Sequence, residues 1–495
     1  GTLFGRNATG GAINVTTKRP TAEFEHHIRA KAGNYNLGEI GASSSGPITD
    51  NLLYRVYAYK QTRDGYIENK TGKDIWDQDN TGFGAQLSWD VSDSFNAWFS
   101  YQNDETDDYT NGLIAQGVLI TPYITDQVTQ DDFFYSEQYQ WDRENPSVTD
   151  PYKIDTNDAL HTRDDNNNKF TTHLTWDLSN VTLKYIGYYG ENDWTAKKGD
   201  LGNTSNPDII GQENSGQFQE TWSHELQVLS MTDGPLQWVG GLYYFTEDKQ
   251  QPYSAVTPNA AYLENTVNVF DPLNMETLQA NPGRLQVEQL TDLETTSYAA
   301  YFDANYTFNE SWKLTAGIRY SRDEKEGKEA QSVISDPFAL GLEGLFRIWE
   351  ATGYPENCCG LWFRDAAIDN RKLEDDWDNV SGRVVLDWTP TDDALIYASI
   401  STGYKAGGFN LGPLQDEPSF DEETLTSYEI GYKGTFAQVL RVNAAAYYYD
   451  YEDMQVETSY LSDEGILLSN LINAAEAEVK GIEIEATWLA TENLT

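Results

Sequence analysis

Residues 104–167 form the part of the sequence that is richest in side chains able to bind a ligand. They include fifteen acidic residues against three basic ones. Carboxylate oxygens suit Ca²⁺, which takes about six to eight oxygen ligands. A solvated acidic loop has the same composition and is the simpler interpretation, so the sequence leaves calcium binding open.

Aromatic side chains in the same stretch are better candidates for capturing a ligand. Flat or sugar-like molecules stack on aromatic rings, and binding sites are lined largely by such side chains. A cluster of loop residues that pack only on one another would look the same in the sequence. The candidate ligand-binding residues are Tyr109, Phe133, Phe134, Tyr135 and Trp141.

Side chains that could catalyse a reaction or hold a metal are scattered along the chain. The adjacent Cys358 and Cys359 form neither a zinc knuckle nor a redox CxxC motif, and whether they form a disulfide is left open. There is no GxSxG motif or Walker loop, and carboxylates are too numerous for a catalytic pair to stand out. We therefore expect no catalytic residue, metal site or cofactor, and we predict that the protein is not an enzyme. The histidines, which lack the spacing of a zinc site, are His26, His27, His161, His173 and His224.

Strand-like alternation is the feature that must position these residues. From Trp312 to Ser321, apolar residues alternate strictly with polar ones, as expected for a strand with one apolar and one polar face. A soluble β-sandwich alternates in the same way, so the pattern alone does not say which face is inside. Further alternating segments are Tyr54–Tyr59, Phe170–Leu178, Tyr298–Thr307 and Gly481–Trp488.

The lengths of the connections decide between these folds. Short connections rich in Asp, Asn, Pro and Gly are expected at 90–94, 179–180, 309–310, 389–393 and 434–438. They alternate with long ones at 104–167, 191–216, 248–292, 323–379, 403–423 and 451–475. Alternate connections of an up-and-down barrel share a rim, and outer-membrane barrels have short periplasmic turns and long outer loops. We therefore predict an all-β, transmembrane, antiparallel barrel with about sixteen strands here, polar residues such as His173 facing the lumen.

The composition agrees with a membrane barrel. The 495 residues show no linker and are 13% aromatic, with 32 Tyr and 14 Trp. Mean hydropathy is −0.61, and no apolar run approaches the roughly 18 residues of a membrane helix, so any crossing must use strands. The net charge of −46 argues against nucleic acid as a partner. Tryptophans expected on the outer face near the short-turn rim are Trp89, Trp176, Trp312, Trp388 and Trp488.

Four segments, in order along the chain, resemble TonB-dependent receptors. The first is similar to the end of the family's plug domain, and the others to successive barrel segments. The resemblance implies a plug inside a barrel of about 22 strands. It divides this chain into residues 1–20, the end of the plug, and residues 21–495, an incomplete barrel that we expect to continue beyond Thr495, because open edges are costly in lipid. The segments are Gly1–Val15, Gly403–Asn410, Tyr428–Gly434 and Ala475–Glu483.

The first of these segments has a physical interpretation of its own. Gly10 and Gly11 allow a sharp turn or a close backbone approach where the chain passes from plug to wall. Arg6, if buried there, needs a carboxylate partner from the lumen. A solvated glycine-bearing loop is the alternative. The plug-motif residues are Gly5, Arg6, Asn7, Gly10, Gly11 and Asn14.

The resemblance also implies a function, namely active import across the outer membrane of a Gram-negative bacterium. The cargo would most often be a ferric siderophore, with oligosaccharide, haem or cobalamin as alternatives, and a passive porin or surface adhesin as alternatives of another class. The implied partners are TonB with ExbB and ExbD, acting through an N-terminal region that this chain lacks, together with outer-membrane lipid and lipopolysaccharide. The negative net charge disfavours an anionic ferric complex unless basic lumen residues such as Arg319 and Arg383 offset it.

Overall fold

A computed structural model gives the structure of the chain. It describes residues 15–69, 72–109, 152–154, 161–199, 212–256, 285–335, 371–411, 419–461, 467–473 and 476–490. Within these residues, no helix is long and apolar enough to cross a membrane.

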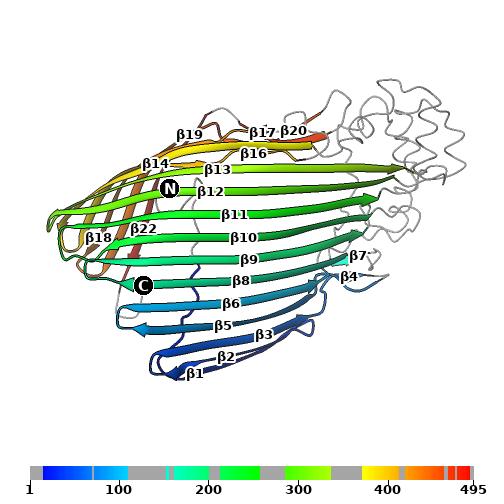
Figure 1. The fold of residues 1–495 in the computed structure, drawn as a ribbon, viewed down its shortest axis with the longest axis horizontal. Coiled ribbons are helices and arrows are strands. Elements are labelled where there is room, and N and C mark those ends of the chain that lie inside the picture. Colours follow the sequence, from blue (N-terminus) through cyan, green and yellow to red (C-terminus); the bar gives the residue numbers. More distant parts are fainter. Residues whose placement is uncertain are drawn as a thin grey trace, which may run out of the picture.

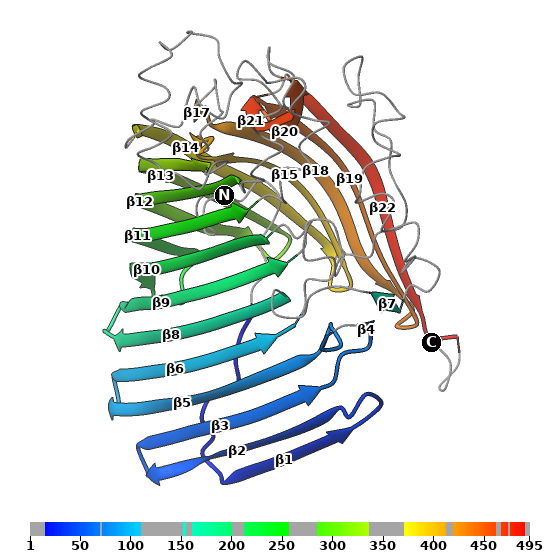
Figure 2. The ribbon, with the colours of Figure 1, turned by 90° about the vertical axis from the view of Figure 1, so that its right-hand side faces the viewer.

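Sixteen strands form one antiparallel sheet that curves into the wall of a barrel (Figures 1 and 2). Their order in the sheet follows their order in the sequence, so each pairs with its neighbours along the chain. In this part of the chain β1 and β22 are the two edges and do not pair with each other, as predicted for a sheet with an open seam. The strands are β1 (Glu25–Ala32), β2 (Gly38–Thr49), β3 (Leu52–Arg63), β5 (Gln78–Ser92), β6 (Phe95–Asp108), β8 (His161–Asp177), β9 (Val181–Gly199), β10 (Gln212–Ser230), β11 (Leu236–Val256), β12 (Leu285–Asn309), β13 (Trp312–Ser335), β14 (Arg371–Thr391), β15 (Ala394–Lys405), β18 (Glu423–Phe436), β19 (Leu440–Glu452) and β22 (Ala477–Trp488).

Three small two-stranded sheets lie outside the wall. They are β4 (Glu68–Asn69) with β7 (Lys153–Ile154), β16 (Gly408–Phe409) with β17 (Ser419–Phe420), and β20 (Gln455–Leu461) with β21 (Leu467–Asn473). All three belong to the connections at the rim opposite the short turns (Figure 1). All of these short strands except β4 fall within the long connections expected from the sequence. We call this rim the mouth of the barrel.

The short turns all lie at one rim, as predicted, but the strands run further toward the mouth than expected. The sequence placed a connection at 248–292, whereas β11 continues to Val256 and β12 begins at Leu285. Similarly, β13 continues to Ser335 and β14 begins at Arg371. The reason is that alternation ends where the lipid ends, because both faces are polar beyond that level, while backbone pairing continues.

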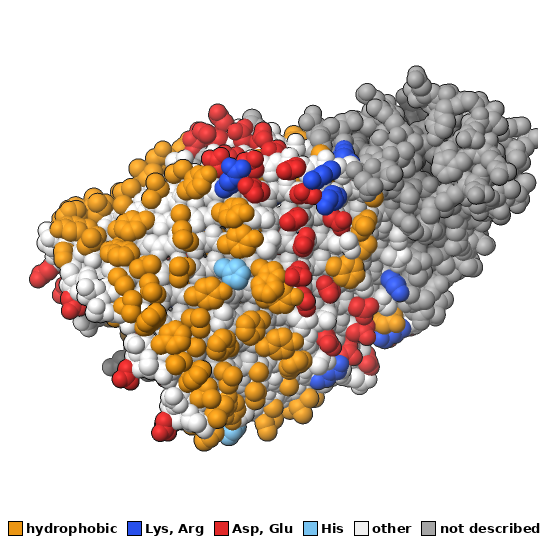
Figure 3. All heavy atoms as spheres, viewed as in Figure 1, with side chains coloured by type: hydrophobic (Ala, Val, Ile, Leu, Met, Phe, Trp, Pro, Cys, Tyr) orange, Lys and Arg blue, Asp and Glu red, His pale blue; other side chains and the backbone are white. Residues whose placement is uncertain are grey.

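The apolar face of the sheet points outward. Val56 is exposed on the outer face, whereas the neighbouring Tyr57 points inward, and Phe302 lies opposite Ile318 with both side chains about half exposed. Hydrophobic side chains cover this face in Figure 3. A soluble sandwich would bury them, so the predicted orientation is confirmed.

Tryptophans form a girdle on the outer face at the short-turn rim, also as predicted. Trp312 of β13 lies opposite Trp388 of β14, and their rings stack with centroids 5.7 Å apart. Indole rings favour the headgroup level of a membrane, which they reach from this rim. The exposed girdle tryptophans are Trp89, Trp176, Trp312, Trp388 and Trp488.

We predict that a charge on the outer face destabilises the barrel far more than a charge on the inner face. Ile400 of β15 is 51% exposed on the outer face, and the adjacent Ser399 points inward opposite Glu429. In the receptor made from the complete gene, Ile400→Arg should lower the free energy of unfolding from lipid vesicles by about 2–4 kcal/mol. The matched variant Ser399→Arg should lower it by less than about 1 kcal/mol, since lumen positions tolerate charge. Equal losses in denaturant titrations would show that the outer face does not contact lipid.

Candidate functional site

Most residues named from the sequence as site residues lie outside the described residues. These are Gly5, Arg6, Asn7, Gly10, Gly11, Asn14, Phe133, Phe134, Tyr135 and Trp141, and the pair Cys358 and Cys359 lies outside as well. Tyr109 is described and follows β6 at the mouth, where Nζ of Lys73 lies 3.8 Å from the centroid of its ring. The roles assigned to all these residues therefore stay predictions.

The segment that leads into β1 crosses the concave side of the sheet and is fastened to the wall by Arg19. The Cζ atom of Arg19 lies 3.5 Å from the ring centroid of Trp98, and its Nη2 lies 3.1 Å from Nδ1 of His173. Trp98 on β6 and His173 on β8 are direct partners in the sheet, with ring centroids 4.9 Å apart. Planar guanidinium groups stack well on indole faces. Arg19 thus lies in the lumen, as expected, and His173 faces the lumen.

A second contact holds the same segment two residues later. The backbone N–H of Thr21 donates to the Ser45 hydroxyl at 2.9 Å, and the two hydroxyls are also 2.9 Å apart. Pro20 lies between the two contacts and favours an extended conformation for Arg19. The chain therefore enters the sheet along a path fixed on β2, β6 and β8.

Trp98 was missed as a site residue, although the sequence contains the signal. Most tryptophans of the wall lie on the apolar register of their strand. Trp98 instead shares its face with Ser100 and Gln102, opposite the apolar face of Ala97 and Phe99. A tryptophan on the polar face of a barrel strand points into the lumen and needs a partner there.

An ion pair connects two strands of the inner wall. Nε and Nη2 of Arg383 on β14 lie 2.8 and 3.1 Å from the two carboxylate oxygens of Asp303 on β12. The Asp303 side chain is 3% exposed, and that of Arg383 31%. This two-bond geometry is the strongest form of carboxylate recognition by arginine. Asp303 therefore holds its charge away from water only because Arg383 is present.

Arg319 is the second basic residue of the inner wall. It is 3% exposed, its Nε donates to Ser321 at 3.0 Å, and its guanidinium carbon lies 5.6 and 5.5 Å from the rings of Tyr243 and Tyr301. The Tyr301 hydroxyl donates to Glu225. The wall thus buries a positive charge among aromatic faces and polar neighbours, and no carboxylate of the described residues bonds directly to this guanidinium.

Charges are sorted between the two faces of the sheet. By strand register, basic side chains on the same face as Arg19 and its partners include Lys184, Lys313, Arg319, Lys325, Arg383 and Lys433. Much of the acidic surplus of the strands lies on the outer face beyond the hydrophobic belt, seen as a red band in Figure 3. The net charge of −46 therefore overstates how acidic the lumen wall is.

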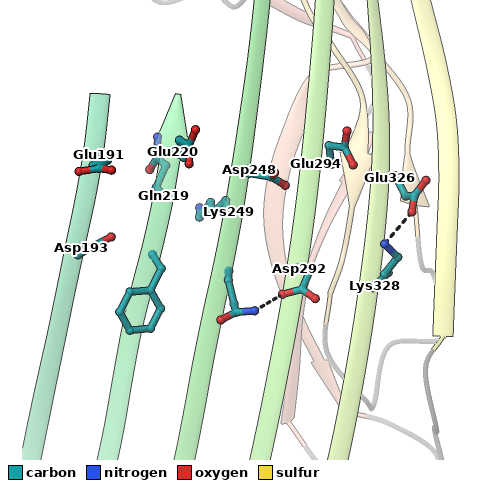
Figure 4. A pocket seen from close by; sticks show the side chains of 12 residues that line it. Glu191, Asp193, Gln219, Glu220, Asp248, Lys249, Asp292, Glu294, Glu326 and Lys328 are labelled. Atoms are coloured by element: carbon teal, nitrogen blue, oxygen red, sulfur yellow. Dashed lines mark hydrogen bonds and ion pairs between the residues drawn. The ribbon is translucent and has the colours of Figure 1, made fainter. Parts of the chain in front are cut away.

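A groove among the described residues belongs to that outer band and not to the lumen. Its volume is about 510 Å³, and Figure 4 shows its side chains on adjacent strands from β9 to β13. Among the described residues no group of His, Cys, Asp or Glu has the arrangement of a metal site. Because the groove lies on the outer face, it is not on a route through the barrel. Its acidic residues are Glu191, Asp193, Glu220, Asp248, Asp292, Glu294 and Glu326.

The mouth is also acidic. Glu422 lies in the connection between β15 and β18, where burial raises the pKa of its carboxyl, and the charges of Asp378 and Asp421 raise it further. Like charges at close range oppose one another's ionisation. The acidic groups of the mouth repel an anionic ligand, so basic groups of the lumen would be needed to attract it.

Comparisons with known proteins agree with this architecture. The family described as "TonB dependent receptor-like, beta-barrel" matches residues 122–495. The pesticin receptor of Yersinia enterocolitica serotype O:8 / biotype 1B is 23% identical over 99% of this chain and 59% of its own length. The ferric-pyoverdine 358 receptor of Pseudomonas putida is 31% identical over 30% of this chain and 17% of its own.

Solved structures show the same fold. The ferric yersiniabactin uptake receptor FyuA of Yersinia pestis superposes with a TM-score of 0.70 at 18% identity, over 99% of this chain and 62% of that one. The siderophore receptor PiuA of Acinetobacter baumannii gives 0.64 at 15% identity, over 98% and 64%. This chain spans about three fifths of the length of the first curated relatives. The lipid-facing wall, the fastened N-terminal segment and the family match together show that the chain belongs to the TonB-dependent receptor β-barrel family of Gram-negative outer membranes.

Proposed function

We propose that this chain is the greater part of the barrel of an active importer whose cargo is a ferric siderophore. The observation that carries the proposal is the attachment of the N-terminal segment to the inner wall through Arg19, Trp98 and His173. A plug domain inside the lumen requires such an entry into β1, whereas a passive porin does not. Residues 1–20 are accordingly the end of the plug, and residues 21–495 belong to the barrel.

The charge distribution supports an anionic cargo. Arg319 and other basic side chains lie on the inner face, while the outer face carries an acidic band. Complementary charge guides a ligand and favours its approach. The objection that the net charge disfavours an anionic ferric complex is thereby weakened. The names of the relatives, among them a ferric-pyoverdine receptor, point to the same class of cargo.

In this proposal, the loops at the mouth and the plug apex bind the cargo, and TonB with ExbB and ExbD supplies the energy to move the plug. The wall contributes shape, charge and a fixed attachment point for the plug. It carries out no chemical step, and its outer face contacts lipid and lipopolysaccharide. Oligosaccharide, haem and cobalamin remain alternative cargoes.

Uptake assays with the complete gene test the cargo. Cells that lack their own siderophore receptors should take up at least one ⁵⁵Fe-labelled complex from a panel of hydroxamate, catecholate and mixed siderophores. Deleting residues 133–141, which hold most of the candidate aromatic residues, should weaken binding of that complex by about tenfold or more, because buried aromatic contacts dominate binding energy.

Deletion of residues 271–279 serves as the control and should leave binding within about twofold, because this stretch has the same length but holds no aromatic residue. If the cells took up haem, cobalamin or an oligosaccharide but no ferric siderophore of the panel, the proposed cargo would be wrong. A steady open channel in planar bilayers would show that the protein is a porin and not an importer.

A further inference from the structure

Two connections meet at the mouth of the barrel. Residues 406–422 connect β15 to β18 and carry β16 and β17, and residues 453–476 connect β19 to β22 and carry β20 and β21. We call them the first and the second mouth loop. The labels β17, β20 and β21 lie together at the top of Figure 2, and β17 contacts β21. Loops of a barrel are generally independent of one another, so their contacts require an explanation.

Each mouth loop sends an asparagine side chain to the main chain of the other. Nδ2 of Asn410 in the first loop donates to the carbonyl of Leu471 at 2.8 Å, and the N–H of Leu471 donates back to Oδ1 of Asn410 at 2.9 Å. In the opposite direction, Nδ2 of Asn473 donates to the carbonyl of Asp421 at 3.0 Å, and the N–H of Asp421 donates to Oδ1 of Asn473 at 2.6 Å. Each side-chain amide thus bonds both the N–H and the carbonyl of one residue of the other loop, as the backbone of a neighbouring strand would.

A buried glutamine adds a third cross-link. Nε2 of Gln455 in the second loop lies 3.0 Å from the carbonyl oxygens of both Ala406 and Asp421 in the first. The backbone N–H of Gln455 donates to the Glu423 carboxylate at 2.9 Å. Gln455 is 8% exposed and Asn410 9%, so water does not readily replace these bonds. Buried polar groups that lose their partners cost more than exposed ones.

The first mouth loop is in turn fixed to the inner wall. Trp377 of β14 packs against Tyr404, Ala406 and Phe409. Lys325 of β13 donates to the carbonyl of Gly407, whose Cα lies so close to Trp377 that a side chain there would collide with the indole. This contact explains why a glycine stands at that position of Gly403–Asn410, one of the segments that resemble the receptor family.

A further bond holds the same segment from the wall. The Tyr404 hydroxyl donates to the Asp323 carboxylate of β13, and Tyr404 is 4% exposed. Gly403–Asn410 is therefore attached to β13 and β14 through a buried aromatic cluster and hydrogen bonds, and it carries Asn410 at its end. The second loop is attached to the wall through Asn410 of the first loop and also directly, through the bond from the N–H of Gln455 to Glu423 of β18.

We propose that the described parts of the two mouth loops, residues 406–411 and 419–422 of the first and 453–461 and 467–473 of the second, form one rigid unit. It is locked by Asn410, Asn473 and Gln455 and anchored on β13, β14 and β18. This side of the mouth then acts as a fixed rim, and a ligand that contacts one of the two loops meets a surface that the other loop holds in place. The other described connections at the mouth are not part of this unit.

Hydrogen exchange of the receptor made from the complete gene tests the unit. Asn410→Ala should speed exchange about tenfold or more at 455–458 in the second loop, which Asn410 does not bond. Asn473→Ala should do the same at Gly408–Phe409 and Ser419–Phe420 in the first loop. The control Glu457→Ala removes an exposed carboxylate whose bond to Ser469 stays within the second loop, and it should leave the first loop unchanged.

Spin labels give a second measurement, which is made first without these variants. Labels at Ser419 and Glu457, one on each loop and both exposed, should give a single narrow distance distribution once Cys358 and Cys359 are replaced by serine. The distribution should broaden when Asn473→Ala is added. Effects of the substitutions confined to the mutated loop, or a broad distribution before any of them, would show that the loops move independently.

Discussion

Uptake of the cargo should fall to background in cells that lack TonB, while binding to the same cells stays unchanged. The reason lies in the wall itself. In the described part of the chain, sixteen strands pair with their neighbours in sequence order from β1 to β22, and a hydrogen-bonded wall of this kind supplies no energy for a transport cycle. A ligand shifts an equilibrium only by its differential affinity for two states, so binding alone cannot drive repeated transport.

The attachment of Arg19 indicates which end of the proposed plug is held by the wall. The segment before β1 is fastened to Trp98 and His173, so in the proposed importer the end of the plug is its fixed end. In the proposed importer, a pull from the inner membrane would then displace the plug from the end that lies away from this attachment. Deleting the TonB box from the complete gene should therefore abolish growth on the cargo and leave binding intact, measured with labelled cargo at 4 °C.

The matched control is the same deletion in cells supplied with an iron source that needs no receptor, where growth should be normal. Continued uptake at the wild-type rate in the TonB-deficient strain would require a diffusion pore. Loss of binding together with uptake would show that the deletion disturbs the plug, and the comparison would then rest on the TonB-deficient strain.

The arrangement of the faces could be predicted from sequence because it depends on local chemistry alone. Along β13 the period of two is strict, and a strand in lipid has to present an apolar residue at every second position. Trp312 and Trp388 follow from the same rule, since both stand at a short-turn rim on the apolar register. Sixteen such strands, with short connections alternating with long ones, predict an up-and-down membrane barrel.

The ends of the strands and the contacts of the mouth could not be predicted, for a different reason. Above the lipid, β12 and β13 carry polar residues on both faces, so the sequence loses its period while the backbone keeps pairing. Asn410 and Leu471 are 61 residues apart, and nothing local to either marks the other as its partner. Non-local polar contacts leave no periodic signal in a single sequence.

Loss of the ion pair between Arg383 and Asp303 should destabilise the inner wall strongly. Replacing Arg383 with methionine keeps most of the volume of the side chain and leaves Asp303, 3% exposed, without its counter-charge. Breaking a buried pair from one side costs about 3–5 kcal/mol. Unfolding from lipid vesicles in denaturant should show this loss for Arg383→Met.

The double variant Asp303→Asn with Arg383→Met separates two costs in free energy: the loss of the ion pair, and the burial of a carboxylate without its counter-charge. It should recover most of the stability, because replacing both members of a buried pair by neutral groups is often close to neutral. Lys313 and Asp387 form a more exposed pair on β13 and β14, with Nζ 2.9 Å from the carboxylate, the lysine side chain 48% exposed and the aspartate side chain 17% exposed. Lys313→Met should cost less than about 1 kcal/mol, as for other solvated pairs. If Arg383→Met cost no more than Lys313→Met, water must reach Asp303 in the assembled receptor, and the inner wall would be wetter than its packing implies.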